Sequence, residues 1–235
     1  GDDFQPVVSR IAAAITPRTK AIILNSPNNP TGAVYPAELL AELDAALPED
    51  VMVISDEPYK PLVFDGLKAP ETAAIVRRTA TAHSWSKSMA ISGERIGYLA
   101  ISPRVAEWDA LRNACTFTNR ILGYINAPAI WQNIIAETAD RTVDVSGYQR
   151  KRDIICEALS SFGYDAPKPA GTFYVFPKSP IPDDMAFIRR LQNEGILAVP
   201  GAGFGRSGYF RLSLTIPLET IERSLPGFER AIKAV

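Results

Sequence analysis

Residues 84–98 read SWSKSMAISGERIGY, and they say more about the chain than any other part of its 235 residues. Lys87 stands just beyond an apolar run, with the hydroxyl side chains of Ser84 and Ser86 before it and Arg95 eight residues after it. Hydroxyl and guanidinium groups are common phosphate ligands. An amine placed beside such ligands is suited to hold a phosphorylated aldehyde as a Schiff base, which is how proteins carry pyridoxal phosphate.

The composition excludes several other classes of site. Apolar residues make up 46% of the chain and charged residues 22%, as in ordinary globular proteins, and the net charge of -1 offers no attraction for nucleic acid. The two cysteines are too few for a disulfide framework, so we expect a cytoplasmic protein. A single histidine, His83, argues against a metal site, and no apolar run approaches the ~18 residues of a membrane span.

The first 150 residues alternate between strand and helix patterns. Short apolar runs that end in polar residues predict strands at 21–24, 51–54, 79–84 and 96–101. Apolar residues at helical spacing predict helices at 36–47, 104–116, 127–139 and 144–162. This alternation predicts an α/β domain with a mostly parallel sheet, which we assign to residues 1–150.

The pattern changes after Gly163. Three strands are expected at 172–176, 196–199 and 209–214, with helices at 183–193 and 218–235. A few strands with two helices predict a small α+β domain, which we assign to residues 151–235. The long helix that begins at Asp144 would connect the two domains.

Polar residues follow three of the predicted strands. Asn29 comes after the first, Asp56 and Tyr59 after the second, and Lys87 after the third. Each has a commonplace explanation when taken alone, such as a turn at Asn29, a helix cap at Asp56 or packing at Tyr59. Ligands of open α/β sheets gather beyond the carboxyl ends of strands, so an amide, an acid, a phenol and an amine at one edge favour a binding site.

These motifs resemble those of class I aminotransferases, which are pyridoxal phosphate enzymes of fold type I. Residues 29–32 read NPTG, Asp56 and Tyr59 match a D-x-x-Y motif, and residues 84–87 with Arg95 match S-x-S-K followed by arginine. Residues 171–174 and 210–213 are similar to segments of the family's small domain. The resemblance covers essentially the whole chain and implies part of the large cofactor-binding domain followed by the small C-terminal domain.

The resemblance also implies a role for each residue. Lys87 would bind pyridoxal 5'-phosphate as a Schiff base and then move a proton during catalysis. Asp56 would keep the pyridine nitrogen protonated, while Asn29 and Tyr59 would hydrogen-bond the phenolic oxygen of the ring. The Asn29–Pro30 peptide is expected to be cis.

The resemblance implies charged contacts as well. Ser84, Ser86 and Arg95 would hold the cofactor's phosphate group. Arg211 lies on a strand whose other face carries Phe210 and Leu212, so it would point away from that face and bind the α-carboxylate of an amino acid.

The chain departs from the family in one respect. Members carry a long N-terminal part with a phosphate-binding turn, an aromatic residue that stacks on the cofactor and a tyrosine that reaches the partner subunit, and none is identifiable here. We therefore expect a fragment of a longer protein, inactive alone, in which four contiguous strands of a seven-stranded sheet leave apolar faces exposed.

The predicted function is transamination between an amino acid and a 2-oxo acid in a homodimer, with an aspartate-type substrate as a family-level expectation. A pyridoxal-phosphate-dependent Cβ–S lyase and the aminotransferase-like sensing domain of a regulator remain alternatives, because both would use the same lysine. Residues 84–87 also match the S-x-x-K motif of β-lactamases. That family's downstream S-D-N and K-T-G motifs are missing, so we set this reading aside.

Overall fold

A computed structural model describes residues 1 and 3–235, which form two compact units. Unit 1 comprises Gly1–Pro27, Val34–Pro61 and Lys68–Val143, and unit 2 comprises Asn28–Ala33, Leu62–Leu67 and Asp144–Val235. Two short segments from the N-terminal part of the sequence therefore belong with the C-terminal residues. A single boundary near residue 150 would assign both segments to the N-terminal domain. That boundary stays a prediction.

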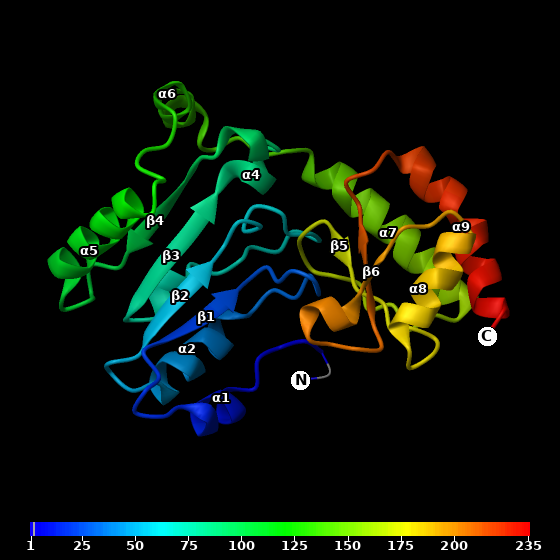
Figure 1. Ribbon diagram of the computed structural model, residues 1–235, viewed down its shortest axis with the longest axis horizontal. Coiled ribbons are helices and arrows are strands. Elements are labelled where there is room, and N and C mark those ends of the chain that lie inside the picture. The colour runs from blue at the N-terminus through cyan, green and yellow to red at the C-terminus, as the bar shows by residue number, and fades with distance from the viewer. Residues whose placement is uncertain (2) are drawn as a thin grey trace. The chain divides into compact units, whose positions relative to one another are not determined.

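Unit 1 is built on a four-stranded sheet (Figure 1). Its strands are β1 (Ala21–Asn25), β2 (Met52–Asp56), β3 (Thr79–Ser84) and β4 (Gly97–Ile101), in the spatial order β1-β2-β3-β4. The first three run parallel, and β4 runs antiparallel to β3. The α/β class and the mostly parallel sheet predicted from the sequence are confirmed.

Helices connect and cover these strands. They are α1 (Val8–Ala14), α2 (Ala37–Ala46), α3 (Thr72–Ile75), α4 (Trp85–Ser88), α5 (Trp108–Ile121) and α6 (Ala129–Thr138), with a 3₁₀ turn at Ser92–Glu94. In α2 the leucines at helical spacing turn inward, and Leu40 and Leu43 are buried in the core with Val53 of β2. The short helices α1, α3 and α4 were not predicted, because one or two turns carry too little periodicity.

Helix α5 begins four residues later than the sequence predicted. Arg104 donates hydrogen bonds from its guanidinium group to the carbonyl oxygens of Ala73 and Val76, and Val105 is buried. These contacts hold residues 102–107 as a loop against the end of β4, so the helix starts only at Trp108. The predicted start at residue 104 is therefore wrong.

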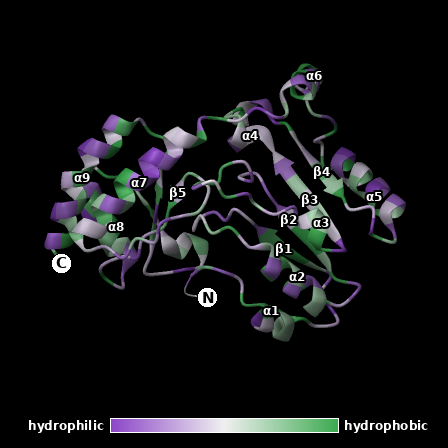
Figure 2. Cartoon of the chain, turned by 180° about the vertical axis from the view of Figure 1, so that it is seen from behind, coloured by the Kyte–Doolittle hydropathy of each residue, from purple (hydrophilic) through white to green (hydrophobic). Residues whose placement is uncertain are grey.

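Unit 2 contains a three-stranded antiparallel sheet with the order β5-β7-β6. The strands are β5 (Tyr174–Val175), β6 (Val199–Pro200) and β7 (Phe210–Ser213), accompanied by α7 (Val145–Phe162), α8 (Asp184–Asn193), α9 (Leu218–Lys233) and a 3₁₀ turn at Gly201–Phe204. Hydrophobic and hydrophilic residues alternate along α9, which buries Ile221 and Phe228 (Figure 2). This is the small α+β architecture that the sequence predicted.

Two strands of unit 2 are shorter than predicted. The expected strand at 172–176 is reduced to Tyr174–Val175, and the one at 196–199 becomes Val199–Pro200. The backbone N–H of Ile196 donates to the carbonyl of Leu191, and Gly195 adopts a positive φ of 76°. Residues 194–196 therefore complete the C-terminal cap of α8 and are not available to the sheet.

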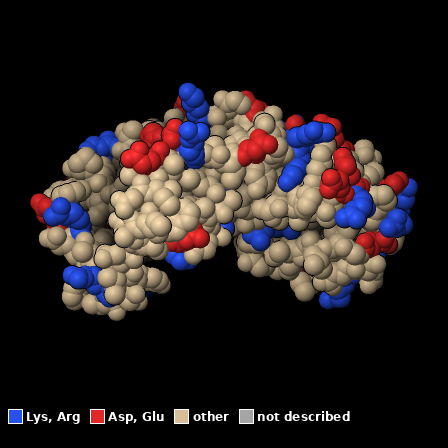
Figure 3. Space-filling model, turned by 90° about the horizontal axis from the view of Figure 1, so that it is seen from above, with Lys and Arg blue, Asp and Glu red and all other residues tan. Residues whose placement is uncertain are grey.

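The surface carries mixed charge and, in unit 1, exposed apolar side chains. Lys and Arg are interspersed with Asp and Glu on the face drawn in Figure 3. Large apolar residues remain exposed on β1, β4 and the α5–α6 region, among them Ile23 at 71%, Leu99 at 47% and Leu122 at 69%, as the sequence predicted. Within the described residues, no helix has the length and apolar character to cross a bilayer, and no three His, Cys, Asp or Glu side chains are grouped to hold a metal ion.

Candidate functional site

The strand register brings the polar strand ends of unit 1 to one edge of the sheet. Asn25 at the end of β1 pairs with Asp56 at the end of β2, and Asp56 pairs with Ala82 of β3. Because β4 is antiparallel, its first residue, Gly97, pairs with Ser84 at the end of β3. The acid of the D-x-x-Y motif and the serines that precede Lys87 therefore lie along the same edge.

Asp56 is partly buried and is oriented by its neighbour on β1. Asn25 donates from Nδ2 both to Oδ2 of Asp56, at 3.2 Å, and to its carbonyl oxygen, at 3.0 Å. Burial raises the pKa of the Asp56 carboxyl, and the Glu57 carboxylate raises that pKa further. A cationic N–H placed against Asp56 would stabilise its ionised form. Sequence reasoning gave Asn25 no role, although its position as the polar end of a strand was a usable signal.

Ser84 and Ser86 border a small hollow at this edge. It has a volume of about 220 Å³ and is lined by Ser84, Ser86, Arg95, Ile96 and Gly97. Ser84 Oγ accepts a hydrogen bond from the backbone N–H of Ser86 at 3.1 Å and lies 2.7 Å from Ser86 Oγ. The two hydroxyl groups are therefore held side by side in the hollow that Arg95 also lines.

Arg95 reaches this hollow through an unusual backbone. Its φ is 51°, in the left-handed region, and its Nη1 donates to the Ser92 carbonyl at 2.7 Å. The following strand lies so close to β3 that a Cβ on Gly97 would stand 2.4 Å from the carbonyl oxygen of His83. Glycine at 97 thus permits the close strand contact that positions Arg95 and Ser84 around one hollow.

Lys87 lies in the single-turn helix α4 that follows β3. Ser84 caps this turn through its side chain, and the end of the turn is tied down at Ser88. The Ser88 carbonyl accepts hydrogen bonds from the Val143 N–H at 2.7 Å and from Thr142 Oγ1 at 3.0 Å. The backbone that carries Lys87 is therefore fixed at both ends, and its side chain is partly buried.

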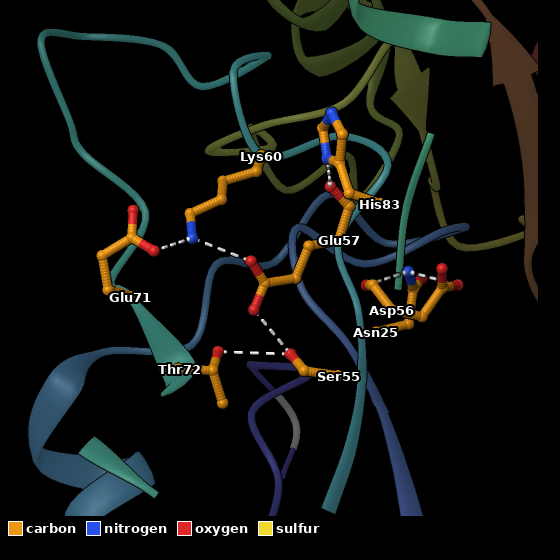
Figure 4. A network of polar contacts seen from close by, with 8 residues as sticks. All are labelled: Asn25, Ser55, Asp56, Glu57, Lys60, Glu71, Thr72 and His83. Carbon is orange, nitrogen blue, oxygen red and sulfur yellow. Dashed lines mark hydrogen bonds and ion pairs between the residues drawn. The ribbon is translucent and has the colours of Figure 1, made fainter. Parts of the chain in front are cut away.

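A buried polar network lies behind Asp56 (Figure 4). Glu57, only 2% exposed, accepts hydrogen bonds from Ser55 Oγ at 2.7 Å and from Lys60 Nζ at 2.8 Å, and Lys60 also bonds Glu71 at 2.6 Å. His83 Nδ1 lies 3.0 Å from the Glu57 carbonyl oxygen. Tyr59, 4% exposed, belongs to the turn that carries Lys60. Only Tyr59 of this group was singled out from the sequence.

Unit 2 contains the other two predicted site residues, and they are in direct contact. Arg211 Nη1 donates a hydrogen bond to Asn29 Oδ1 at 2.8 Å. The guanidinium carbon lies 4.2 Å from the ring centre of Tyr174 and 4.6 Å from that of Phe204. Residues 210, 212 and 214 are buried whereas Arg211 is only partly buried, which agrees with the predicted alternation along the strand. Two aromatic rings and one amide therefore orient this arginine.

The turn that carries Asn29 is closed by its own hydrogen bonds. The Gly32 N–H donates to the Asn28 carbonyl at 2.8 Å, and Thr31 Oγ1 donates to Asn28 Oδ1 at 2.8 Å. Gly32 has a φ of 70°, and a Cβ there would stand 2.3 Å from Cβ of Pro169. The Asn29–Pro30 peptide is cis, as the resemblance implied; the Ser26–Pro27 peptide is also cis, which was not predicted.

The predicted site residues are thus divided between the units. Asp56, Tyr59, Ser84, Ser86, Lys87 and Arg95 belong to unit 1. Asn29 and Arg211 belong to unit 2, where they touch each other.

Comparison with known proteins identifies relatives along the whole chain. The family model for aminotransferase class I and II matches residues 1–226. A probable aspartate/prephenate aminotransferase of Thermus aquaticus is 35% identical over 238 residues, and aromatic-amino-acid aminotransferase 2 of Thermococcus litoralis is 32% identical over 252 residues. Each match covers 99% of this chain and 62% of the relative, so the chain spans 62% of the length of these proteins.

Solved structures agree with the sequence matches. An aminotransferase from Eubacterium rectale matches with a TM-score of 0.96 and 35% identity, over 99% of this chain and 60% of that one. An aspartate aminotransferase from Thermus thermophilus with maleate matches with a TM-score of 0.84 and 32% identity, over 98% of this chain and 61% of that one. The resemblance inferred from the motifs is therefore confirmed, and the chain belongs to the class I and II aminotransferase family.

Proposed function

We propose that the protein is a transaminase that moves an amino group between an amino acid and a 2-oxo acid, with pyridoxal 5'-phosphate bound at Lys87. The observation that carries this proposal is the sheet edge of unit 1. There the strand register aligns a partly buried acid, Asp56, with the serine-lined hollow that precedes Lys87. An acid, a phosphate site and an amine are the three groups that this cofactor requires of a protein.

The hollow beside Ser84 suits the cofactor's phosphate group. Two hydroxyl groups 2.7 Å apart and Arg95 line it, and none of its lining residues carries a carboxylate that would repel a phosphate. Charge-assisted hydrogen bonds from such donors bind phosphate strongly. Ser84, Ser86 and Arg95 therefore hold the phosphate in this proposal.

Asp56 suits the pyridine nitrogen. A carboxyl whose pKa is raised by burial gains stabilisation when a cationic N–H bonds it, and Asn25 already orients it. Tyr59 and Asn29 would donate hydrogen bonds to the phenolic oxygen of the ring. Asn29 Oδ1 accepts a hydrogen bond from Arg211 Nη1, so the Asn29 Nδ2 group would be the donor to the phenolic oxygen. When bound, the cofactor supplies an electron sink for the substrate's α-carbon.

Lys87 and Arg211 act on the substrate. Lys87 Nζ would take the proton from the substrate's α-carbon, because a free amine at that position is a general base. Arg211 binds the α-carboxylate through paired N–H donors, held in one orientation by Tyr174 and Phe204. Fixing the carboxylate and the amine together orients the bond that must break.

We also propose an aspartate-type or aromatic donor and a homodimeric assembly. The relatives named above act as aspartate/prephenate and aromatic-amino-acid aminotransferases by their names, and class I sites are commonly built at a two-fold interface. Exposed apolar residues on α5 and near α6 support such an interface.

The test is to locate the cofactor and then follow the amino group. Incubation with pyridoxal 5'-phosphate and borohydride, followed by peptide mass spectrometry, should place a stable adduct on Lys87, and Lys87→Ala should lack it. An adduct at random surface lysines, or none, would overturn the proposal. With the cofactor bound, formation of the matching 2-oxo acid and new amino acid supports transamination, whereas pyruvate with ammonia would indicate a lyase.

A further inference from the structure

Glu57 is a buried carboxylate that the proposed reaction does not use. It is 2% exposed and follows Asp56 directly in the chain, and both of its oxygens are hydrogen-bonded (Figure 4). A hydroxyl group, on Ser55, and an ammonium group, on Lys60, are its partners. Lys60 Nζ forms an ion pair with the buried Glu57 carboxylate at 2.8 Å, in the interior of unit 1.

The charges around Glu57 do not cancel. Burial acts to lower the pKa of Lys60, but its hydrogen bonds to Glu57 and Glu71 outweigh burial and raise that pKa, so Lys60 is charged. Burial lowers the pKa of His83, which is therefore neutral near pH 7. Tyr98, whose pKa is raised by burial, is neutral as well. The side chain of Glu71 is 73% exposed and is screened by solvent, so the buried negative charge next to Asp56 is that of Glu57.

The backbone holds this charge at a fixed place relative to Asp56. The Glu57 N–H donates to the Ala82 carbonyl at 2.8 Å, and the Glu57 carbonyl contacts His83 Nδ1 at 3.0 Å. On the other side, the Asp56 carbonyl accepts from Asn25 Nδ2 and from the Ser26 N–H. The peptide between the two acids is therefore tied to β1 and β3 at once.

We propose that Glu57 is a positioning residue for the cofactor: its buried negative charge acts through Asp56 to keep the pyridine nitrogen protonated. This inference rests on the proposed function, because it gives Glu57 a role beside Asp56, the acid proposed to contact the cofactor ring. The proton concerned lies between Asp56 Oδ and the ring nitrogen, and Glu57 does not touch it. A negative field at this point favours the pyridinium cation over neutral pyridine, and the protonated ring accepts electrons from the substrate more readily.

Two substitutions separate charge from shape. Glu57→Gln keeps the size and the hydrogen bond from Ser55 but removes the charge, whereas Glu57→Asp keeps the charge and shortens the side chain. Glu71→Gln is the matched control, because Glu71 is the exposed end of the same network, with 73% of its side chain accessible. If Glu57 acts by its charge, Glu57→Gln should change the Asp56 titration more than Glu57→Asp does. If its role is only structural, Glu57→Asp should change that titration at least as much.

The first readout needs no cofactor. Carboxyl ¹³C NMR of the apoprotein should show Asp56 titrating at lower pH in Glu57→Gln than in the wild type, with Glu57→Asp and Glu71→Gln close to the wild type. An unchanged Asp56 titration in Glu57→Gln would overturn the proposal, and so would a lowered Asp56 titration in Glu57→Asp, which keeps the charge.

The second readout uses ¹⁵N-labelled pyridoxal 5'-phosphate. The ring nitrogen should lose its proton at lower pH in Glu57→Gln, and cofactor affinity at mildly alkaline pH should fall about three- to tenfold because a charge interaction is lost. Glu71→Gln should retain both properties. Failure of the wild type to bind the cofactor at Lys87 would refute the proposed function instead, and the apoprotein titration would still decide whether Glu57 acts on Asp56.

Discussion

Asn29 and Arg211 are 182 positions apart in the sequence, and a 2.8 Å hydrogen bond from Arg211 Nη1 to Asn29 Oδ1 joins them in unit 2. The bond uses one arm of the guanidinium group and fixes the direction in which its remaining donors point. One amide thereby links the turn of the NPTG motif to the arginine proposed to bind the substrate's carboxylate. This relationship leads to the first of five predictions.

Replacement of Asn29 by Asp should weaken substrate binding. A carboxylate at position 29 would pair with Arg211 and compete with the substrate's carboxylate, so we expect KM for the amino acid to rise about tenfold or more, the value of a charged hydrogen bond. Steady-state kinetics of the cofactor-loaded protein measure this. Ser213→Ala, at an exposed position on the same strand, is the control. An unchanged KM in Asn29→Asp would argue against a carboxylate site at Arg211.

Loss of the Arg152–Asp65 pair should destabilise unit 2. The Arg152 side chain is fully buried and bonds both oxygens of Asp65, at 2.7 and 2.8 Å, and also the Pro169 carbonyl. We expect Asp65→Ala to cost about 1–3 kcal/mol of unfolding free energy, since the buried guanidinium group loses one carboxylate, half exposed, and keeps its ion pair with Asp153. Chemical denaturation provides the measurement. Asp50→Ala, which removes an exposed pair with Lys20, should change stability by less than about 0.5 kcal/mol.

The same pair should produce a pH dependence with a definite sign. The hydrogen bond from Arg152 lowers the pKa of Asp65 in the folded state. The unfolded chain then takes up a proton at Asp65 at higher pH than the folded chain. Stability from this group is present above the ordinary carboxyl pKa and is lost as the pH falls toward the lowered one. Asp65→Asn should remove this part of the acid destabilisation, and an unaltered acid limb of the stability curve would contradict the assignment.

His83 should contribute a second acid transition. Burial lowers its pKa from the ordinary value of 6.5. The unfolded chain therefore binds a proton at pH values where folded His83 does not, so stability should decline as the pH falls below 6.5, down to the lowered pKa. Because His83 is the only histidine, its single set of imidazole NMR signals reports the folded pKa directly. A His83 titration at or above 6.5 would contradict the prediction.

Gly97→Ala should disturb the contact between β3 and β4. The added Cβ would stand 2.4 Å from the His83 carbonyl oxygen, so the strands must separate, at an expected cost of about 1–3 kcal/mol. Phosphate affinity at the hollow lined by Ser84 and Arg95 should fall with it. Gly93→Ala is a matched control, because its Cβ would meet no atom within 4 Å. Equal denaturation midpoints for the two variants would show that the strand spacing tolerates the extra methyl group.

Much of the architecture could be predicted from local patterns. The four strands of unit 1 were expected within a residue or two of their observed limits, because each is a short apolar run ended by polar residues. Helices α2, α6, α7, α8 and α9 were recovered as well, since their apolar spacing and flanking residues mark them. The errors fell where tertiary contacts decide an element's limits: Arg104 delays α5, and the cap of α8 at Gly195 shortens the strand that follows.

The candidate site divides in the same way. The motif residues are visible because their types and spacing are local properties, so Lys87, Asp56, Arg95 and Arg211 could be named in advance. Asn25 stands at the polar end of a strand, which was a usable signal, but its contact with Asp56 and the burial of Glu57 depend on packing that the local sequence does not show.

The sequence by itself determined the order of strands and helices, the lysine that follows β3 and the family to which the chain belongs. Only the tertiary structure decided that Asn29 meets Arg211, that Lys60 bridges Glu57 and Glu71, and that segments 28–33 and 62–67 join the C-terminal unit. The physical reason is the range of the interactions. Periodicity and capping act between neighbours in the chain, whereas the partner of a polar side chain and the field around it depend on which distant segments pack against it.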